Sequence, residues 1–247
     1  MKPLALLLVL LVALPMLLAI RDLPPAGTPD APIHTHVGAR YVEGSLAETG
    51  MRNVVTAVLL NYRGFDTFLE VVVIFTALAA VLALPRPGPA GTVLVVAETS
   101  PRGAVRRPTW REAIPVSPLV SFVVRLLAPF IAVFAVAVLY QGHVSPGGGF
   151  QGAAVLGALF IALSLTLGPE RAKRLIPRGA RAWLQGAAPL VFALVAFVGW
   201  RLSGAVLGFP TESGTEALRD ALVFALEIGI VVGGAVVLAR LFIAMEA

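Results

Sequence analysis

The sequence contains no cysteine among its 247 residues. Disulfide bonds, thiolate zinc or iron–sulfur sites and covalent haem attachment are therefore excluded, and any redox chemistry would belong to a partner. Charged residues are also scarce, at 13% of the chain. No nucleophile, base and orienting group stand together in the sequence, so it does not indicate an enzyme that acts alone.

Apolar residues dominate instead. Hydrophobic types make up 58% of the chain, and the mean hydropathy is +0.89. Lipid rather than water must solvate such a chain, so we predict an all-α integral membrane protein. The basic residues behind the net charge of +5 gather in two short loops between apolar segments, where they act as a topology signal. We predict no nucleic-acid partner, no cofactor and no metal.

Apolar runs near the ~20 residues that cross a bilayer as a helix predict about six transmembrane helices. They lie at roughly 3–20, 66–84, 118–140, 152–168, 183–203 and 219–243. With the N-terminus inside, the inner segments carry twice as many Lys and Arg residues as the outer ones. Cytoplasmic loops carry this excess, so both termini are predicted to be cytoplasmic.

The chain divides into a two-helix and a four-helix unit. Residues 85–116 hold six prolines and five arginines, a composition that breaks helices and predicts a cytoplasmic linker between units at 1–84 and 117–247. Within it, Thr92–Glu98 predicts a short strand or an interfacial stretch. The first apolar run also has features of a signal peptide, but it lacks a clean cleavage site, and we interpret it as a retained helix.

The first unit contains two segments of special composition. His34 and His36 at i and i+2 can point at one metal from a strand, but few further ligands stand nearby, and solvated loop histidines are favoured. The apolar stretch Asn53–Leu60 is too short to cross, so it either lies at the interface or re-enters the membrane.

Acidic residues near lipid are the main candidates for function. Arg63, Asp66 and Glu70 share one helical face, and such a cluster can hold or exchange a cation. The alternative is a helix N-terminus whose acids complement the helix dipole. Glu227 lies about nine residues into an apolar span, where a carboxylate must be protonated, paired or facing a wet cavity. We interpret it as part of an ion path, with a structural hydrogen bond as the alternative.

Two further candidates belong to the third predicted span, one inside it and one just after its end. Arg125 lies about two turns inside it, where snorkelling to the headgroups or a structural ion pair is favoured. His143 follows its end, where a helix C-terminus favours the protonated imidazole. His143 either relays protons or caps the helix.

A glycine-rich segment then separates two apolar runs. Its irregular backbone needs partners other than lipid. No Gly-Lys-Ser/Thr follows, which argues against a phosphate cradle. We predict a tight turn whose glycines let backbone approach a neighbouring subunit. The motif residues are Gly142, Ser145, Pro146, Gly147, Gly148, Gly149 and Gln151.

The run from Gly142 to Gly152 resembles the signature of the B subunit of Mrp-type multisubunit sodium/proton antiporters and of its counterparts in membrane-bound hydrogenase and related complexes. The four-helix unit fits the size of that subunit. The stretch from Asn53 to Glu70 resembles the C-terminal end of the large A subunit, or the small separate subunit that matches it in the hydrogenase complexes. Together these resemblances cover most of the chain.

The resemblance implies a non-catalytic membrane subunit in a prokaryotic plasma membrane, packed among antiporter-like subunits related to those of respiratory complex I. In that family the glutamate of the Arg-Gly-x-Asp-Thr-x-x-Glu pattern, here Glu70, serves cation transport. The A-like and B-like units are joined in this chain and the large antiporter portion is missing. Three hypotheses stay open: a Na⁺/H⁺ antiporter subunit that lines the ion path, the same module in a redox-driven complex, and a pure scaffold.

Overall fold

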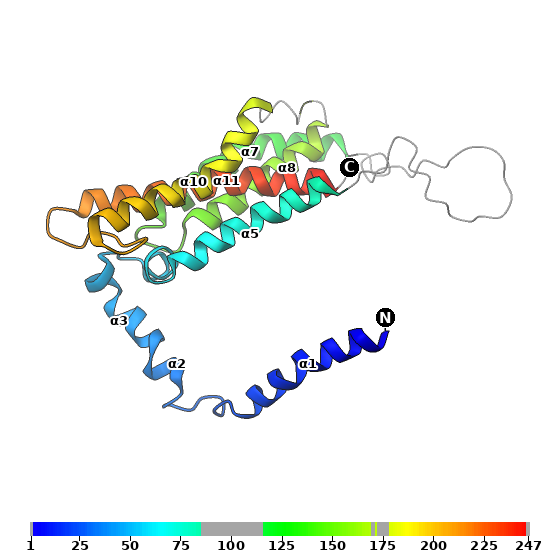
Figure 1. The fold of residues 1–247 in the computed structure, drawn as a ribbon. Helices are drawn as coiled ribbons and strands as arrows, with labels where there is room; N and C mark the ends of the chain where they lie inside the picture. The colour runs from blue at the N-terminus through cyan, green and yellow to red at the C-terminus, as the bar shows by residue number, and fades with distance from the viewer. Residues whose placement is uncertain (1, 85–115, 169–170, 172–177, 246–247) are drawn as a thin grey trace. The chain divides into compact units, whose positions relative to one another are not determined.

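The computed structural model describes residues 2–84, 116–168, 171 and 178–245, and every regular element in these ranges is a helix (Figure 1). The elements are α1 (Lys2–Arg21), α2 (Pro32–Thr35), α3 (Val37–Thr49), α4 (Val54–Ala57), the π-helix η1 (Val58–Tyr62), α5 (Gly64–Ala83), α7 (Pro118–Gln141), α8 (Gly149–Leu167), α10 (Arg178–Ser203) and α11 (Glu216–Met245). The predicted linker, with its possible strand at Thr92–Glu98, lies almost entirely outside the described residues.

Five helices in the described ranges are long and apolar enough to cross a membrane: α5, α7, α8, the Trp183–Ser203 part of α10, and α11. They confirm the prediction of an all-α membrane protein. The first predicted span forms α1, whose apolar part counts only as the shorter stretch Val9–Arg21, so five full-length spans are found rather than six.

The chain forms two compact units, at residues 1–44 and 45–247. The first contains α1, α2 and the beginning of α3. Proline at the first position of α2 suits a helix start, because its missing N–H needs no partner there. His34 and His36 are both exposed at this short helix rather than on a strand. A strand geometry that would point both imidazoles at one metal is therefore absent from this described segment.

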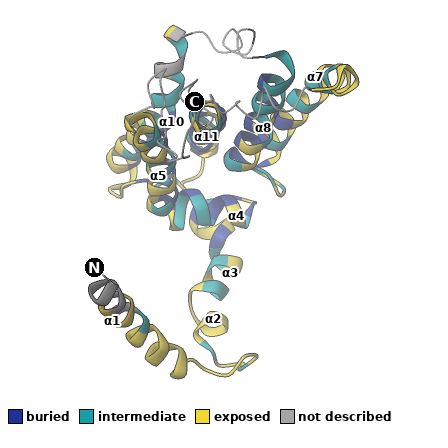
Figure 2. Cartoon of the chain, turned by 90° about the vertical axis from the view of Figure 1, so that its right-hand side faces the viewer, coloured by how far each residue is buried: buried dark blue, intermediate teal, exposed yellow. Residues whose placement is uncertain are grey.

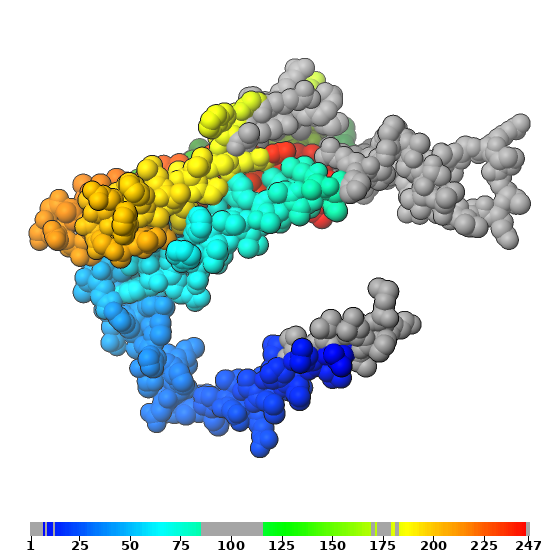
Figure 3. Space-filling view, in the orientation of Figure 1, coloured from blue at the N-terminus to red at the C-terminus, as the bar shows by residue number. Residues whose placement is uncertain are grey.

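Helix α11 is the centre of the second unit. It packs against α8, α10 and α5, while α7 packs mainly on α8 (Figure 2). Its apolar window is 56% buried, compared with 11–28% in the other four spans. Figure 3 shows α5 and α10 side by side on one face of this unit, in agreement with their contacts. Side chains on the inner face of α11 are therefore enclosed by its neighbours.

Small residues allow the close packing of α11. A Cβ at Gly233 would lie 2.9 Å from the Cβ of Ala188, and one at Gly229 would lie 3.2 Å from the Cβ of Val191 on α10. In lipid, where apolar side chains gain little by contacting one another, small residues let helix backbones approach and gain van der Waals contact.

Two interruptions of regular helix meet within this unit. The stretch Asn53–Tyr62 is a four-residue α-helix followed by the π-helix η1, in keeping with a segment too short to cross. The segment between α7 and α8 is irregular only from Gly142 to Gly148, which we call the glycine loop. Gly149, Phe150 and Gln151, predicted as loop, begin α8. The chain turns at Gly148, whose φ of +123° is accessible only to glycine.

Candidate ion-path site

Glu227 is the most deeply enclosed acidic group among the described residues. Its position twelve residues into α11 corresponds to about 16 Å along the axis from Glu216, at ~1.5 Å per residue. The residue is 2% exposed, and its Oε2 atom has no hydrogen-bond partner among the described residues. Because an ionised carboxylate without partners is very costly to bury, this group has to be protonated, paired or hydrated.

His143 supplies the nearest titratable partner. Its Nε2 atom lies 3.7 Å from Glu227 Oε2, and its imidazole ring packs 5.6 Å from the ring of Phe224 on α11. The separation is too long for a direct hydrogen bond. The His143 side chain is 28% exposed while that of Glu227 is 3% exposed, so the pair leads from the interior toward the surface of the chain.

The glycine loop lies directly against the Glu227 carboxyl group. A Cβ added to Gly142 would lie 2.6 Å from Glu227 Oε1, and one added to Gly148 would lie 3.3 Å from the same oxygen. Neither position has room for a side chain without displacing the carboxyl. The loop backbone therefore approaches helix α11 of the same chain closely. The predicted approach to a neighbouring subunit stays a prediction.

Hydrogen bonds from the segment before η1 hold this loop. The Asn53 amide nitrogen donates to the carbonyl oxygens of Gly142 at 2.7 Å and Ser145 at 2.8 Å. The Thr56 hydroxyl donates to the Gly142 carbonyl at 2.6 Å. Asn53 also accepts a bond from the backbone N–H of Val55, which caps α4.

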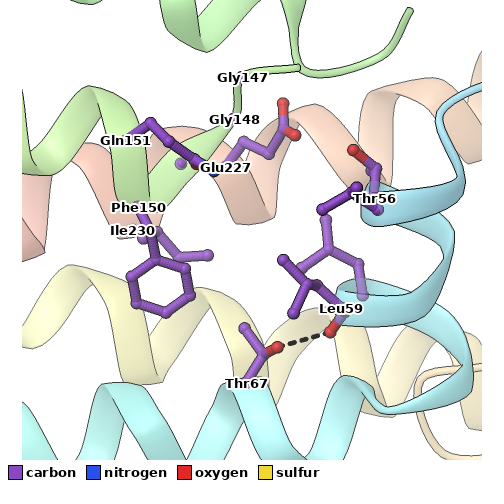
Figure 4. A pocket seen from close by; sticks show the side chains of 12 residues that line it. Thr56, Leu59, Thr67, Gly147, Gly148, Phe150, Gln151, Glu227 and Ile230 are labelled. Atoms are coloured by element: carbon purple, nitrogen blue, oxygen red, sulfur yellow. Dashed lines mark hydrogen bonds between the residues drawn. The ribbon is translucent and has the colours of Figure 1, made fainter. Parts of the chain in front are cut away.

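A small cavity of about 20 Å³ adjoins the carboxyl group, enough for about one water molecule. Figure 4 shows Glu227 and the glycine loop on one side of it, Thr56 and Leu59 on another, and Phe150 with Ile230 at its apolar end. The Thr67 hydroxyl on α5 donates to the Leu59 carbonyl at 2.6 Å. The cavity walls thus bring together α11, the glycine loop, α4 with η1, and α5.

The acidic cluster of α5 has a different setting. Arg63 and Asp66 form an ion pair, with side chains 60% and 48% exposed. Glu70 is exposed one turn further on, and it has no hydrogen-bond or ion-pair partner within the described ranges. The inward face of α5 is formed instead by Gly64, Thr67 and Val71.

The remaining predicted residues divide into structural contacts and surface positions. Gly147 packs on α7, where a Cβ would lie 2.5 Å from the Val138 carbonyl oxygen. Gly149 packs against Ile230, and Gln151 lines the cavity. Pro146 and Arg125 are exposed. Across the described part of the chain, no group of three or more His, Cys, Asp or Glu side chains lies close enough to hold a metal ion.

Sequence reasoning missed three contributors to this region. Asn53 and Thr56 were not singled out, although an asparagine before an apolar segment is a helix N-cap signal. Arg219 was counted with the outer loops, but it is 8% exposed, and its guanidinium occupies the space that a Cβ at Gly50 would need. No local pattern distinguishes this buried arginine from a surface one.

Comparisons with known proteins agree with this architecture. Residues 119–238 match the family model of a domain related to the MnhB subunit of Na⁺/H⁺ antiporter, and residues 29–98 match the model of MbhE, a subunit of MBH. The chain is also similar to a chain of the membrane-bound sulfane sulfur reductase (MBS), an archaeal respiratory membrane complex. The identity is 27% and the TM-score 0.64, with 99% of this chain and 97% of that chain covered. Together these matches support a membrane subunit of the Mrp and MBH type.

The chain also has the fold of part of a chain in the Mrp complex from Dietzia sp. DQ12-45-1b, at 21% identity and a TM-score of 0.64. That match covers all of this chain but spans about a quarter of the other, at 26%. Comparison with curated proteins finds no match. Within the chain, Glu227, His143 and the glycine loop lie in the MnhB-related range, whereas Asn53, Thr56 and the α5 cluster lie in the MbhE range.

Proposed function

We propose that this subunit is a non-catalytic part of a Na⁺/H⁺ antiporter-like complex in a prokaryotic plasma membrane. It works among other membrane subunits and contributes to the path of the ions. The family models and the five apolar spans support this role. Any redox activity belongs to partner subunits.

The observation that carries the proposal is the buried Glu227 carboxyl beside a small cavity. Its Oε2 atom lacks a partner among the described residues, while His143 Nε2 lies 3.7 Å away. A water molecule in the cavity or a small movement of the imidazole would connect them. Transfer of a proton between the two groups leaves the charge of the pair unchanged, which suits a site from which bulk water is excluded. Glu227 and His143 therefore act as proton carriers.

Glu70 provides a second point of the path. Its exposure on α5 supports a site completed by another subunit, because a glutamate in a membrane span does not face lipid at low cost. Asp66, paired with Arg63, lies in the first turn of the same helix. The cation role of Glu70 follows from the family resemblance.

The test is ion transport by the complex reconstituted in proteoliposomes, with Glu227→Gln and His143→Gln variants of this subunit. We expect Glu227→Gln to reduce sodium-driven proton flux to background and His143→Gln to slow it. Glu212→Gln, a substitution at an exposed glutamate outside the helices, is the matched control. Normal assembly and undiminished flux in both test variants would support a scaffold role instead.

A second candidate is the same module in a redox-driven complex. It is favoured by the near-complete match to a chain of an archaeal respiratory complex, in contrast to the partial match to the Mrp chain. Purification of the native complex and measurement of its iron content and visible spectrum separate the two. Iron–sulfur or haem partners in stoichiometric amount would favour the redox-driven assembly.

A further inference from the structure

We infer that Asn53 and Thr56 are positioning residues for Glu227. They hold the glycine loop closed over the buried carboxyl group, and so determine how far that group is accessible. The inference deepens the proposed function. The positioning of Glu227 is argued from the structure, and only its effect on ion transport rests on that function. The contacts lie within the compact unit of residues 45–247.

Every hydrogen-bonding group of the Asn53 side chain is used. Its amide nitrogen donates to two loop carbonyls, of Gly142 and Ser145, and its oxygen accepts from the N–H of Val55. The residue is 9% exposed, so water does not replace these partners readily. A fully satisfied buried amide has one favoured orientation, and it ties the loop at two points to the start of α4.

Thr56 adds a third hydrogen bond to the loop, at Gly142, the residue that lies against the Glu227 carboxyl. Its hydroxyl donates to the Gly142 carbonyl, which also accepts from Asn53, so this carbonyl has two donors. The Gly142 carbonyl follows the end of α7, where carbonyl groups have no partner within the helix. Side chains distant in sequence therefore take the place of the usual local helix cap.

The held residue, Gly142, also lies directly against the functional group. Gly142 leaves no room for a Cβ between itself and Glu227 Oε1, and His143 is the next residue. A movement of Gly142 away from α11 would open space at the carboxyl and shift the imidazole in the same step. Asn53 and Thr56 thus act on Glu227 through the loop, without touching the carboxyl.

The experiment measures the access of a carbodiimide to Glu227 in the purified complex. Dicyclohexylcarbodiimide modifies protonated carboxyl groups in apolar surroundings, and peptide mass spectrometry locates the modified residue. Glu70 in the same chain serves as an internal reference. The variants are Asn53→Ala and Thr56→Val, with Thr56→Ser as the conservative control that retains the hydroxyl, and Glu227→Gln to verify the site.

We expect Thr56→Val to raise the labelling rate at Glu227 relative to Glu70 by roughly fivefold, the change in loop opening that corresponds to one typical buried hydrogen bond. Asn53→Ala should raise it further, and Thr56→Ser should restore the wild-type rate. Equal labelling in the wild type and these three variants, or equal increases with Val and Ser at position 56, would overturn the inference. Changed labelling together with normal transport by Glu227→Gln would refute the proposed function alone and leave the positioning role standing.

Discussion

Two acidic regions of this subunit differ in how far their own chain encloses them. On α5, Asp66 and Glu70 lie on the outer surface of the chain, and Arg63 pairs with Asp66 alone. On α11, Glu227 is enclosed by elements of its own chain, among them the glycine loop and the segment of α4 and η1. We propose that another subunit completes the first region, whereas the second is enclosed by elements of this chain.

Irregular backbone adjoins both regions. The glycine loop lies against Glu227, and the π-helix η1 directly precedes the helix that carries Asp66 and Glu70. Protein side chains such as Asn53 and Thr67 satisfy carbonyl groups of these two segments. At α5 the helix is regular, and its acids project outward. The two regions therefore differ in how far their acids are enclosed, and not in whether irregular backbone adjoins them.

The largest loss of stability is expected for Gly142→Ala, which places a new methyl group in the enclosed region. The new Cβ would lie 2.6 Å from Glu227 Oε1 and 2.7 Å from the Gly148 Cα, so backbone has to move. Overpacking of this kind costs about 3 kcal/mol. Thermal unfolding of the purified chain measures it. Gly186→Ala on α10, whose Cβ would meet only Leu190 at 3.9 Å, should be neutral or slightly stabilising and is the control.

The comparison also predicts a difference between the two glutamates. In the isolated chain, Glu227→Gln should retain or raise the thermal stability, because an amide avoids burying a charge. Glu70→Gln should leave the isolated chain unchanged and reduce ion flux only in the assembled complex. Stability in detergent and flux in proteoliposomes are measured for both variants. An effect of Glu70→Gln on the isolated chain would remove the distinction between a shared and an internal site.

Gly50→Ala is expected to loosen the segment that precedes Asn53. Gly50 has φ of +70°, and the Arg219 guanidinium fills the place of its missing side chain. Gly214 has a similar φ of +90° with nothing within 4 Å, so Gly214→Ala isolates the backbone cost of about 1–2 kcal/mol. The loss of unfolding free energy should be clearly greater at position 50. Equal losses would mean that Arg219 simply moves aside.

The smallest effect is expected for Asp66→Asn in the isolated chain. The Arg63–Asp66 pair is half exposed, and such pairs contribute about 0.2–1 kcal/mol. The melting temperature should hardly change, and it should change less as salt is added. A large loss of stability here would show that the α5 face is more tightly built than its exposure indicates.

The sequence was sufficient for the helices and for the most deeply buried acid. Long apolar runs have few alternatives in lipid, so α7 and α10 were located within a few residues. The position of Glu227 along its span indicated an unusual carboxyl. The start of α8 was predicted three residues late, because the glycines from Gly147 onward suggest a loop, although Gly149 is helical.

The partners of Glu227 required the structure. The bond from Asn53 to the Gly142 carbonyl joins residues 89 positions apart, and neither hydropathy nor helical spacing records such a contact. Similarly, Arg219 has the sequence context of a loop arginine but packs against Gly50. Periodicity describes which face of one helix is apolar, whereas the site arises where several segments are held together.

The depth of Glu227 has an electrical consequence. At about 16 Å along a helix of about 45 Å, it lies roughly a third of the way from the Glu216 end of α11. A proton that reaches the carboxyl from that end would cross part of the transmembrane voltage, of which the whole is worth about 2.3 kcal/mol per charge for each 100 mV. Occupancy of this one group would then respond to the energised state of the membrane as well as to proton concentration.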